Sequence, residues 1–565
     1  MTLPNVNTVF QDGGLGSAPP SVAGITVTMG LCSKGIPNTI YAVNDNATAQ
    51  AALGIGPLVQ ALAYKGGTRY AMPLTPSTAG TAGSVTQTGT GAGTVTVTLA
   101  PAQAILAKIT TAGALGTMAV AFSVGGGAYG TPVVSTASAF SIVVPGTLTT
   151  LTFAAQTYTV AAVWTISTLG VITLSGTGTV GWVTQVSSPL DAYAVILAIT
   201  TGGALGTAVF TASLDGGNNT GAPIATPGGG VYSIPNTGIV LTFASTFVAG
   251  DTYSFSTTTA TCNNTDLNTA LTALMALPID FESIHVAATP ASAAAAATEF
   301  ATVDAALVAA QTAFRYVYGV IECPTVEADA TIVAAFTALS SLRTMVSVGD
   351  IAANQPLDGR IERRNSAWVA SAHIAAIPAG EDAGFVNSTA QITGVANLYP
   401  NFGSTGWDPT LLDSQRFMTL RQFPGPAGTP GTFIADGFIM APPGSDFGLI
   451  QHRRVMDVAA RAARRVLLKY LNGSVRVNLK TGAIDPRDAF IIESSIDSAI
   501  AAAILAPGFV SGGYDPVKPG KFAQLSRTQN LLSTNSEPLS ISITPLGYLK
   551  FITATFGFRN PALTV

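Results

Sequence analysis

The sequence predicts a multidomain protein with an α+β and α/β core, an inserted all-β module (a tandem β-sandwich), and extended N- and C-terminal β-arms. Strand and helix patterns alternate over 24–78 and again over 261–440, which is typical of a largely parallel sheet. The segment 79–260 between them carries short strands and Gly/Pro turns instead. Both ends of the chain show alternating apolar residues with no neighbouring helix pattern to cover them.

Composition excludes several classes of protein. Charged residues make up 10% of the 565, against about 25% in an ordinary soluble domain. Because hydrophobic residues reach 48% and charge is scarce, the composition is the opposite of a disordered chain. A formal net charge of −4 argues against nucleic-acid binding through bulk positive charge. Three Cys in the whole chain exclude a disulfide scaffold.

The apolar composition does not predict membrane insertion. A spanning helix needs about 20 predominantly apolar residues, whereas the uncharged stretch between Lys108 and Asp191 carries Thr, Ser, Gly or Pro every few positions. The Ala-rich run Ala291–Ala297 is too short and is followed by Glu299. The first Lys is Lys34, so no basic region precedes an apolar core as in a secretory signal. We expect a protein made in a cytoplasm and used there or in a particle assembled there.

The N-terminal segments divide into an arm and half of a domain. Residues 1–23 are polar with Gly and Pro punctuation, and they are predicted to form an extended arm containing a short strand at Val6–Phe10. Residues 24–78 are predicted to form the first part of the α/β domain. Its expected elements are a strand at Ile25–Met29, helices at Ala47–Leu53 and Pro57–Tyr64, and a strand at Arg69–Met72.

The segment 79–260 contains an internal duplication. Its only charged residues are Lys108, Asp191, Asp215 and Asp251. Two stretches recur at a shift of 90, the first with eight of nine residues identical: Ile109–Thr117 as Ile199–Thr207, and Leu151–Ala154 as Leu241–Ala244. Two copies, at about 84–170 and 171–260, therefore predict a duplicated β-sandwich module inserted at a loop of one domain.

The segment 261–440 is predicted to be the second part of the same α/β domain. Its pattern alternates between helix and strand, so its first partner is expected to be 24–78. The expected helices are Leu267–Leu277, Ala291–Phe314 and Glu327–Leu342, and the expected strands are Ser283–Ala287, Tyr316–Glu322 and Val346–Gly349.

Positive charge is concentrated in 441–537, which is predicted to be a core domain with a basic helix. Nine Lys/Arg stand against three Asp between Ala441 and Arg487, and a helix is expected at about 449–471. Four cations at i, i+3, i+4 and i+8 share one side of that helix: Arg461, Arg464, Arg465 and Lys469. Such a run is usually a solvated face, but in a chain so poor in charge we favour docking onto an acidic partner.

No motif predicts catalysis, a cofactor or a metal. His285, His373, His452, Cys32, Cys262 and Cys323 are far apart and lie outside any CxxC or HExxH spacing, so each Cys is expected to fill a core. The loop Asp215–Asn219 resembles a calcium loop, but it lacks the acids and the closing Glu, which favours a β-turn. We expect that the protein is not an enzyme and needs no cofactor.

The last segment, 538–565, is predicted to be a C-terminal β-arm. Ser540–Thr544 and Tyr548–Phe558 are hydrophobic strand-forming stretches, and an exposed edge of this kind must find a partner strand. Pairing with the sheet of another copy would link two subunits through backbone hydrogen bonds. The residues expected to form such inter-subunit strands are Val6, Val9, Phe10, Ile541, Ile543, Leu549 and Phe551.

The order of these segments resembles the contractile-tail sheath family. The opening is similar at Val22–Ile25, Lys34–Asn38, Ala51–Gly54 and Ala61–Gly67. The later course is similar from Leu411–Phe423 through Gly425–Gly431 and Phe433–Phe438 to His452-Arg453-Arg454, as are Gly512-Gly513-Tyr514 and the alternating C-terminus. The resemblance excludes 79–260. It also departs from the family at Ile36, where Gly-Pro is commoner, and at Ile377–Gly380, which replaces a "PSG" loop.

The resemblance implies a structural subunit of a phage tail sheath of the myophage type. In that family six copies form a ring around a tail tube, rings stack helically, and the lattice shortens without nucleotide to drive the tube through the host envelope. Terminal arms link neighbouring subunits, inserted domains project outward, and the inner domain holds the tube, here through Arg461, Arg464, Arg465 and Lys469. The implied partners are other copies, the tube, baseplate and tail terminator proteins, in a virion assembled in the bacterial cytoplasm.

Two other classes stay open on the sequence alone. One is a different self-assembling shell, such as a surface-layer or capsid-decorating protein, although the expected lack of a signal peptide argues against a surface layer. The other is a carbohydrate-binding adhesin, since aromatic residues of the duplicated module could stack on sugars: Trp164, Trp182 and Tyr253. Core packing is the favoured interpretation of these three side chains, and an enzyme such as a hydrolase is a more distant alternative.

Overall fold

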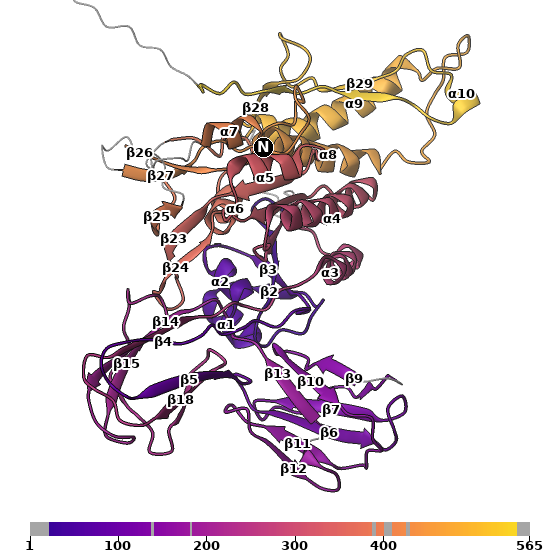
Figure 1. The fold of residues 1–565 in the computed structure, drawn as a ribbon. Helices are drawn as coiled ribbons and strands as arrows, with labels where there is room; N and C mark the ends of the chain where they lie inside the picture. Colours follow the sequence, from indigo (N-terminus) through magenta and orange to yellow (C-terminus); the bar gives the residue numbers. More distant parts are fainter. Residues whose placement is uncertain are drawn as a thin grey trace, which may run out of the picture.

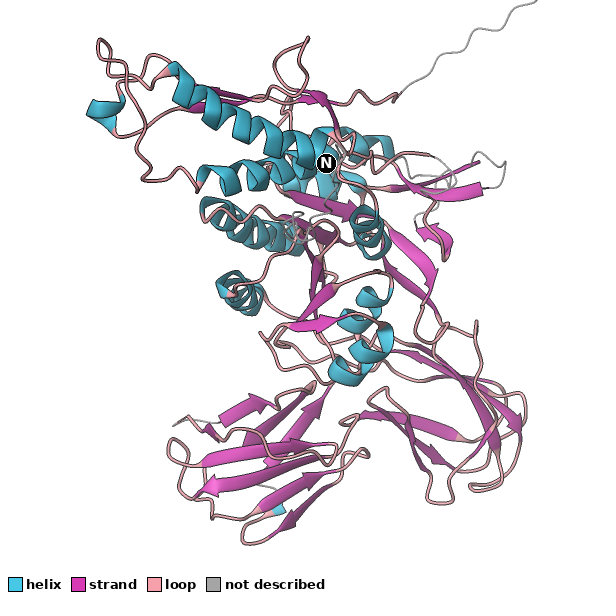
Figure 2. Cartoon of the chain, turned by 180° about the vertical axis from the view of Figure 1, so that it is seen from behind, coloured by secondary structure: helices cyan, strands magenta, loops and turns pink. Residues whose placement is uncertain are grey.

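The computed structural model describes residues 22–136, 140–180, 183–386, 391–399, 409–424 and 430–550. The molecule is elongated (Figures 1 and 2): two β-lobes lie at one end, a mixed sheet with flanking helices lies in the middle, and the last helices and strands lie at the other end. Val6, Val9, Phe10, Trp182 and Phe551 lie outside the described residues.

The central sheet joins segments from both sides of the β-lobes. Its order is β2-β3-β1-β20-β21-β22, formed by Tyr41–Val43, Arg69–Pro73, Thr26–Gly30, Ser283–Ala287, Tyr318–Cys323 and Thr344–Val348. All neighbours are parallel except β2 and β3, which pair antiparallel. Since β1 pairs directly with both β3 and β20, the strands of the β-lobes lie in the sequence between two halves of one sheet.

Helices cover both faces of this sheet. Leu and Phe side chains of α3 (Asn264–Ala276), α4 (Ala293–Thr312) and α5 (Asp329–Phe336) form one core with alternate strand residues. The opposite face is covered by α1 (Asn46–Leu53), α2 (Pro57–Ala63) and α6 (Ala367–Ala376). Three helices begin at side-chain caps that accept a backbone N–H: Asp45, Asn263 and Ser292.

Two helices deserve comparison with the sequence. By length and composition alone, α4 is the one described helix that could cross a membrane; its Phe300, Val303 and Leu307 are fully buried in the core beside the sheet. The helix expected at 327–342 ends early, at Phe336. The following turn uses the Ser341 hydroxyl to accept the N–H groups of Arg343 and Thr344, so a side chain replaces helical backbone bonds there.

A smaller sheet and a hairpin extend the central domain. The sheet β24-β23-β25 is formed by Ile361–Asn365, Asp350–Asn354 and Val395–Tyr399. The short helix α7 (Pro409–Ser414) precedes the hairpin of β26 (Leu420–Pro424) and β27 (Pro430–Ile434). Strands β23, β25, β26 and β27 share one apolar core with α6, whereas Leu412 of α7 belongs to the core formed by α3, α4 and α5.

Each β-lobe holds a five-stranded and a three-stranded sheet around its own apolar core. The first has the orders β12-β11-β6-β7-β8 and β13-β10-β9, and the second has β16-β15-β14-β19-β4 and β17-β18-β5. The strands are β4 Thr86–Thr88, β5 Thr94–Leu99, β6 Ile105–Thr111, β7 Ala119–Val124, β8 Val133–Val134, β9 Phe140–Val143, β10 Thr149–Phe153, β11 Val163–Ile166, β12 Ile172–Ser175, β13 Val183–Ser187, β14 Ala194–Thr201, β15 Val209–Ser213, β16 Ile224–Ala225, β17 Val231–Ile234, β18 Ile239–Ala244 and β19 Thr252–Ser256.

The two lobes repeat local structure as well as sequence. A register shift lies between Ile109 and Thr111 in the first lobe and between Ile199 and Thr201 in the second. A chain of ring contacts also recurs, Phe153–Tyr158–Trp164 in the first and Phe243–Phe247–Tyr253 in the second. The two copies therefore keep the same bulge and the same aromatic core geometry.

Strand pairing divides the lobes differently from the expected copies at 84–170 and 171–260. The strands β4 and β5 pair with β19 and β18 of the second lobe, whereas β12 and β13 pair with β11 and β10 of the first. The first lobe is therefore continuous in sequence, and the second contains strands from both sides of it. Sequence identity marks the duplication but contains no information on which flanking strand pairs with which sheet.

The inner end of the molecule is helical. It contains α8 (Ile450–Leu467), α9 (Pro486–Ile500) with a π-helical turn at Ala501–Leu505, and the four-residue helix α10 (Leu531–Thr534). Two antiparallel pairs complete it, β28 (Val510–Gly512) with β31 (Thr544–Pro545) and β29 (Ala523–Leu525) with β30 (Leu539–Ile541). Apolar residues from β28, β29, β30 and both long helices share one core.

Candidate assembly surfaces and joints

The first turns of α8 are tied to the central domain by buried ion pairs. Asp457 accepts both guanidinium nitrogens of Arg343, at 2.9 and 3.1 Å, and also accepts Arg453 Nε at 2.9 Å. Arg454 donates to Glu282, just before β20, with Nε 2.7 Å from Oε1. All five of these charged side chains are buried, so these ion pairs lie inside the molecule.

The structure corrects the role expected for Arg461. Its guanidinium donates to the backbone carbonyls of Phe281 and Tyr316, and the side chain is half-buried between α8 and the central sheet. Sequence spacing placed Arg461 beside Arg465 on one face, but the central domain covers the part of that face that carries Arg461. Arg461 therefore joins α8 to the central domain. Its contacts do not support a role as a free cation that docks onto a partner.

The other three cations lie toward the C-terminal end of α8. Arg464 stacks on Phe314, with its guanidinium carbon 3.5 Å from the ring centroid. Arg465 and Lys469 are exposed. A groove of about 530 Å³ lies beside Arg464, lined by Phe314, Tyr316, Ala460, Ala463, Arg464, Leu467, Leu468, Leu471 and Ile541. Arg464 thus borders an apolar groove, whereas Arg465 and Lys469 are exposed outside its lining.

The expected C-terminal strands pair within their own chain up to β31. Ile541 lies opposite Ala523 in the β29–β30 pair, and Ile543 packs against the inner core. Leu549 is 86% exposed. As far as the described residues go, Ile541 and Ile543 thus already have partners, because α9 and β29 bring strands of the same subunit alongside them.

A second joint fixes one β-lobe to the central domain. Asp191, which lies between the lobes and is fully buried, accepts Gln60 Nε2 at 2.7 Å and binds Arg364 at 2.5 Å and Arg360 at 3.3 Å. Glu362 binds the same two guanidiniums. Burial alone would raise the pKa of Asp191, but Arg364 and Arg360 hold it below its ordinary value.

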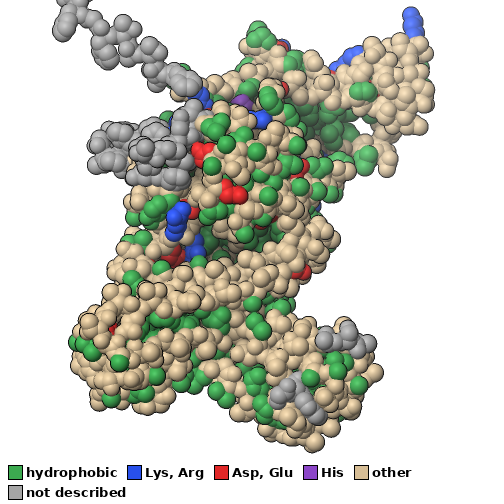
Figure 3. All heavy atoms as spheres, viewed as in Figure 1, with side chains coloured by type: hydrophobic (Ala, Val, Ile, Leu, Met, Phe, Trp, Pro, Cys, Tyr) green, Lys and Arg blue, Asp and Glu red, His purple; other side chains and the backbone are tan. Residues whose placement is uncertain are grey.

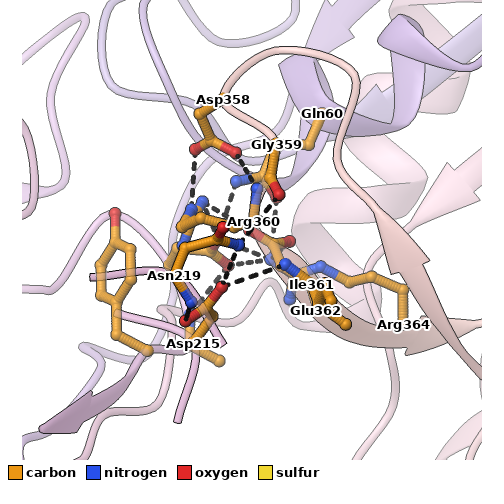
Figure 4. A network of polar contacts seen from close by, with 12 residues as sticks. Gln60, Asp215, Asn219, Asp358, Gly359, Arg360, Ile361, Glu362 and Arg364 are labelled. Carbon is orange, nitrogen blue, oxygen red and sulfur yellow. Dashed lines mark hydrogen bonds and ion pairs between the residues drawn. The ribbon is translucent and has the colours of Figure 1, made fainter. Parts of the chain in front are cut away.

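The loop expected to be a turn adds to this joint. Asp215 accepts the backbone N–H groups of Asn219 and Ile361 at 2.8 and 3.2 Å, and Asn219 donates to the carbonyl of Gly359 at 3.1 Å. Figure 4 shows these side chains converging on the 358–364 hairpin. Because protein donors saturate the Asp215 carboxylate, the loop acts as a clamp, and its geometry does not suit calcium.

Buried titratable groups also lie under α2. Lys65 Nζ is 3.3 Å from His285 Nδ1 and donates to Thr28 at 2.8 Å, and His285 Nε2 is 3.4 Å from Glu322. Burial lowers the pKa values of Lys65 and His285 well below their ordinary ones and raises that of Glu322 to about 7. The cluster is sealed by Trp368, which donates to Glu322 at 2.6 Å, so it has no route for a substrate.

Metal ligands do not gather in the part of the chain that the structure describes. Groups of three or more His, Cys, Asp or Glu that could hold a metal are absent from those residues. All three Cys are free thiols; Cys32 and Cys323 are buried and Cys262 is half-buried, as expected for core filling. Burial raises the pKa of Cys32 to about 11, which makes it a poor nucleophile.

Two family models match the chain, one after the other. The model of the DUF2586 N-terminal domain matches residues 3–438, and that of the DUF2586 C-terminal domain matches 446–563. This chain belongs to the DUF2586 family. The two DUF2586 models meet just before α8, which is where the central domain ends and the inner helices begin. A comparison with curated proteins finds no match.

Two solved structures similar to this DUF2586 chain are described as sheath structures. One is the crystal structure of a sheath tail protein from Listeria innocua, with 12% identity, a TM-score of 0.43 and 93% of each chain covered. The other is the sheath complex of an extracellular contractile injection system in its contracted state, with 12% identity and a TM-score of 0.37, covering 55% of this chain and 77% of that one.

Sequence reasoning missed the joints of this DUF2586 chain. Asp191 is one of only four charged residues in the segment 79–260. That isolation is a signal in the sequence, because a lone charge there needs a partner of opposite charge elsewhere in the chain. Arg360 directly precedes β24 and Arg364 lies in it four residues later, so extended backbone places both side chains on one face. The pairing of these residues with Asp191 could not be predicted from the sequence, because only the fold brings them together.

Proposed function

We propose that this chain is the subunit of a contractile tail sheath, which assembles as stacked hexameric rings around a tail tube and contracts to drive the tube through a host envelope. The observation that carries this proposal is the placement of the sheath-like motifs. Those within Val22–Gly67 lie just before β1, in the loop before β2, at the end of α1 and at the end of α2, and those within Leu411–Arg454 run from α7 past β26 and β27 to α8. Although 79–260 interrupts them, they fold into one body around the central sheet.

The polarity of the subunit supports a radial arrangement. The β-lobes and the inner helices lie at opposite ends of the molecule (Figure 1), and the lobes carry almost no charged side chains on the face seen in Figure 3. In a sheath the lobes would project outward as a duplicated β-sandwich module, while the inner helices would approach the tube. An uncharged, hydroxyl-rich outer surface suits contact with solvent on a particle.

The inner cations would provide the contact with the tube. Arg465 is exposed on α8, Lys469 is exposed in the turn that follows it, and Arg464 lies on Phe314 at the edge of the apolar groove. A tube surface with carboxylates beside an apolar side chain would satisfy both features. Because surface ion pairs each contribute only about 0–1 kcal/mol, such a contact would hold the tube through many weak copies and release it during contraction.

Work in this proposal comes from the lattice, without a catalytic step or a cofactor. Other copies, the tube, the baseplate and a tail terminator would be the partners, and the virion tail, assembled in a bacterial cytoplasm, would be its location. Terminal arms, expected at 1–23 and 538–565, would supply the inter-subunit strands that keep copies linked while the lattice shortens.

The adhesin alternative loses its main support. Trp164 and Tyr253 are buried in the cores of the two lobes, at 0% and 1% exposure, so neither ring can stack on a sugar. A different self-assembling shell stays as the competing function. Negative-stain microscopy of the purified chain separates them: hollow tubes support a sheath, flat lattices support a surface layer, and dispersed monomers under all assembly conditions contradict both.

A further inference from the structure

The C-terminal segment of the chain crosses from the inner domain back onto the central domain. After β31, which pairs with β28, residues 546–550 run to the loops that follow α6 and β27. Tyr548 donates its hydroxyl to the carbonyl of Gly380 at 3.0 Å, and its ring lies 5.8 Å from that of His452 in α8. This contact spans both domains.

The receiving surface is built by loops that pack unusually closely. A Cβ added to Gly380 would lie 2.5 Å from Phe509 Cα, and one added to Gly437 would lie 2.7 Å from Ile450 Cγ2. Only glycine permits these approaches. They hold two carboxylates on one surface, Asp382 and Asp436, whose side chains are 10% and 17% exposed.

Lys550 lies between these two carboxylates. Its Nζ donates to Asp382 and, at 2.9 Å, to Asp436. Burial raises the pKa of Asp436, and the neighbouring Asp382 raises it further, while Lys550 counteracts both effects. Burial alone would lower the pKa of Lys550, but the hydrogen bonds to the two carboxylates raise it above its ordinary value. The pair of acids therefore needs a cation, and the chain supplies it from its own C-terminal segment.

We propose that the Asp382–Asp436 pair is a docking site that holds the C-terminal segment on its own subunit through Lys550, so that any strand exchanged with a second copy begins after residue 550. The anchor through Lys550 does not depend on the sheath function, whereas the exchange of a strand with a second copy rests on it. It moves the start of the exchangeable arm from 538, as the sequence pattern suggested, to 551, because β30, β31, Tyr548 and Lys550 all bind the same chain.

The anchor is tested first on the soluble, unassembled full chain. Lys550→Glu places a third carboxylate against Asp382 and Asp436, and we expect amide hydrogen exchange in 544–550 to rise at least tenfold. The charge-reversed double variant Lys550→Glu/Asp436→Lys should return exchange toward the wild-type rate. Lys480→Glu, at an exposed lysine elsewhere in the inner domain, is the matched control and should leave 544–550 unchanged. Unchanged exchange in Lys550→Glu would overturn the anchor, whether or not the chain forms tubes.

The start of the exchanged segment is tested in assembled tubes. Gln524 and Ser540 lie directly opposite each other on β29 and β30 and are both exposed, so a Gln524→Cys/Ser540→Cys variant can close a disulfide without disturbing a core. Oxidised tubes should give monomers on non-reducing gels if β30 stays on its own subunit. A ladder of covalent multimers would show that β30 itself is exchanged and would contradict the proposal. The absence of tubes from the wild-type chain would instead contradict the sheath function.

Discussion

Arg454 in α8 and Glu282 before β20 form a buried ion pair that joins the inner helices to the central sheet. Arg454 Nε lies 2.7 Å from Glu282 Oε1, and the two side chains are 1% and 4% exposed. The other oxygen of Glu282 accepts the backbone N–H of Gly24 at 2.5 Å, and Arg454 also donates to the carbonyl of Ile377 at 3.1 Å. One carboxylate thus holds the start of β1, the start of β20 and α8 in a fixed arrangement.

Removing one partner of this ion pair should lower the free energy of unfolding. Arg454→Met leaves the Glu282 carboxylate buried without its cation, and the expected loss in free energy of unfolding is about 3–5 kcal/mol. Urea unfolding followed by circular dichroism measures it. The matched control is Arg476→Met, because the Arg476 side chain, which pairs with Asp488, is 61% exposed and its loss should change the free energy of unfolding far less. Equal losses in the two variants would show that burial does not set the strength of the Arg454 pair.

The exposed cations of α8 should affect assembly and leave the fold intact. Arg465→Glu/Lys469→Glu is expected to weaken binding of tube protein at least tenfold in a sedimentation assay, with the melting temperature of the free chain unchanged. Arg461→Met should do the reverse and lower the melting temperature, because Arg461 binds the carbonyls of Phe281 and Tyr316. Lys34→Glu, at an exposed lysine near the β-lobes, is the control and should change neither quantity. Full tube binding by Arg465→Glu/Lys469→Glu would show that these two cations do not contribute to the contact with the tube.

Stability should depend on pH through Glu299. Burial, followed by repulsion from Glu322, raises the pKa of Glu299 well above its ordinary value, and its Oε1 has no hydrogen-bond partner among the described residues. Protonated Glu299 therefore favours the fold below the unfolded pKa, near 4.5, and this contribution is lost as the pH rises through the folded pKa.

The variant Glu299→Gln removes this titration. Its free energy of unfolding should match the wild type near pH 4 and exceed it increasingly at higher pH, with a slope of at most about 1.4 kcal/mol per pH unit for one proton. Glu381→Gln in a surface loop is the control and should show no such divergence. Parallel pH profiles of Glu299→Gln and wild type would contradict a buried, raised Glu299.

The joint at Asp191 should hold the second β-lobe on the central domain. Asp191→Asn removes the charge that balances Arg360 and Arg364, so amide exchange should rise in β24 and at the start of β14 while β20–β22 stay protected. Asp251→Asn is the matched control, because Asp251 binds the N–H groups of Thr90 and Gly91 within the lobe. Loosening of β24 by both variants alike would mean that Asp191 is not the joint.

The sequence predicted the elements of the central domain well because their signals are local. The strand at Ser283–Ala287 and the helix at Ala47–Leu53 follow from apolar periodicity and the capping Asp45, which act over a few residues. The pairing of β4 and β5 with strands of the second lobe could not be predicted, because it depends on which sheet edge these strands reach in the folded chain. Sequence identity at a shift of 90 is silent on that point.

The candidate site was predicted only in part, for the same reason. Helical spacing predicted a cationic stretch at the end of α8, where Arg465 and Lys469 are exposed, and their docking role stays a prediction. It failed for Arg461, because periodicity within one helix says which residues share a face and nothing about what covers that face. Lys550 was not considered, since its two acids lie 114 and 168 residues away in sequence.

Cryo-electron microscopy of the chain assembled with its tube protein tests the sheath function most directly. The account predicts rings of six copies around an inner tube, with the β-lobes at the largest radius and Arg465 and Lys469 facing the tube. Rings without an inner tube contact at α8, or a lattice in which the β-lobes point inward, would contradict it.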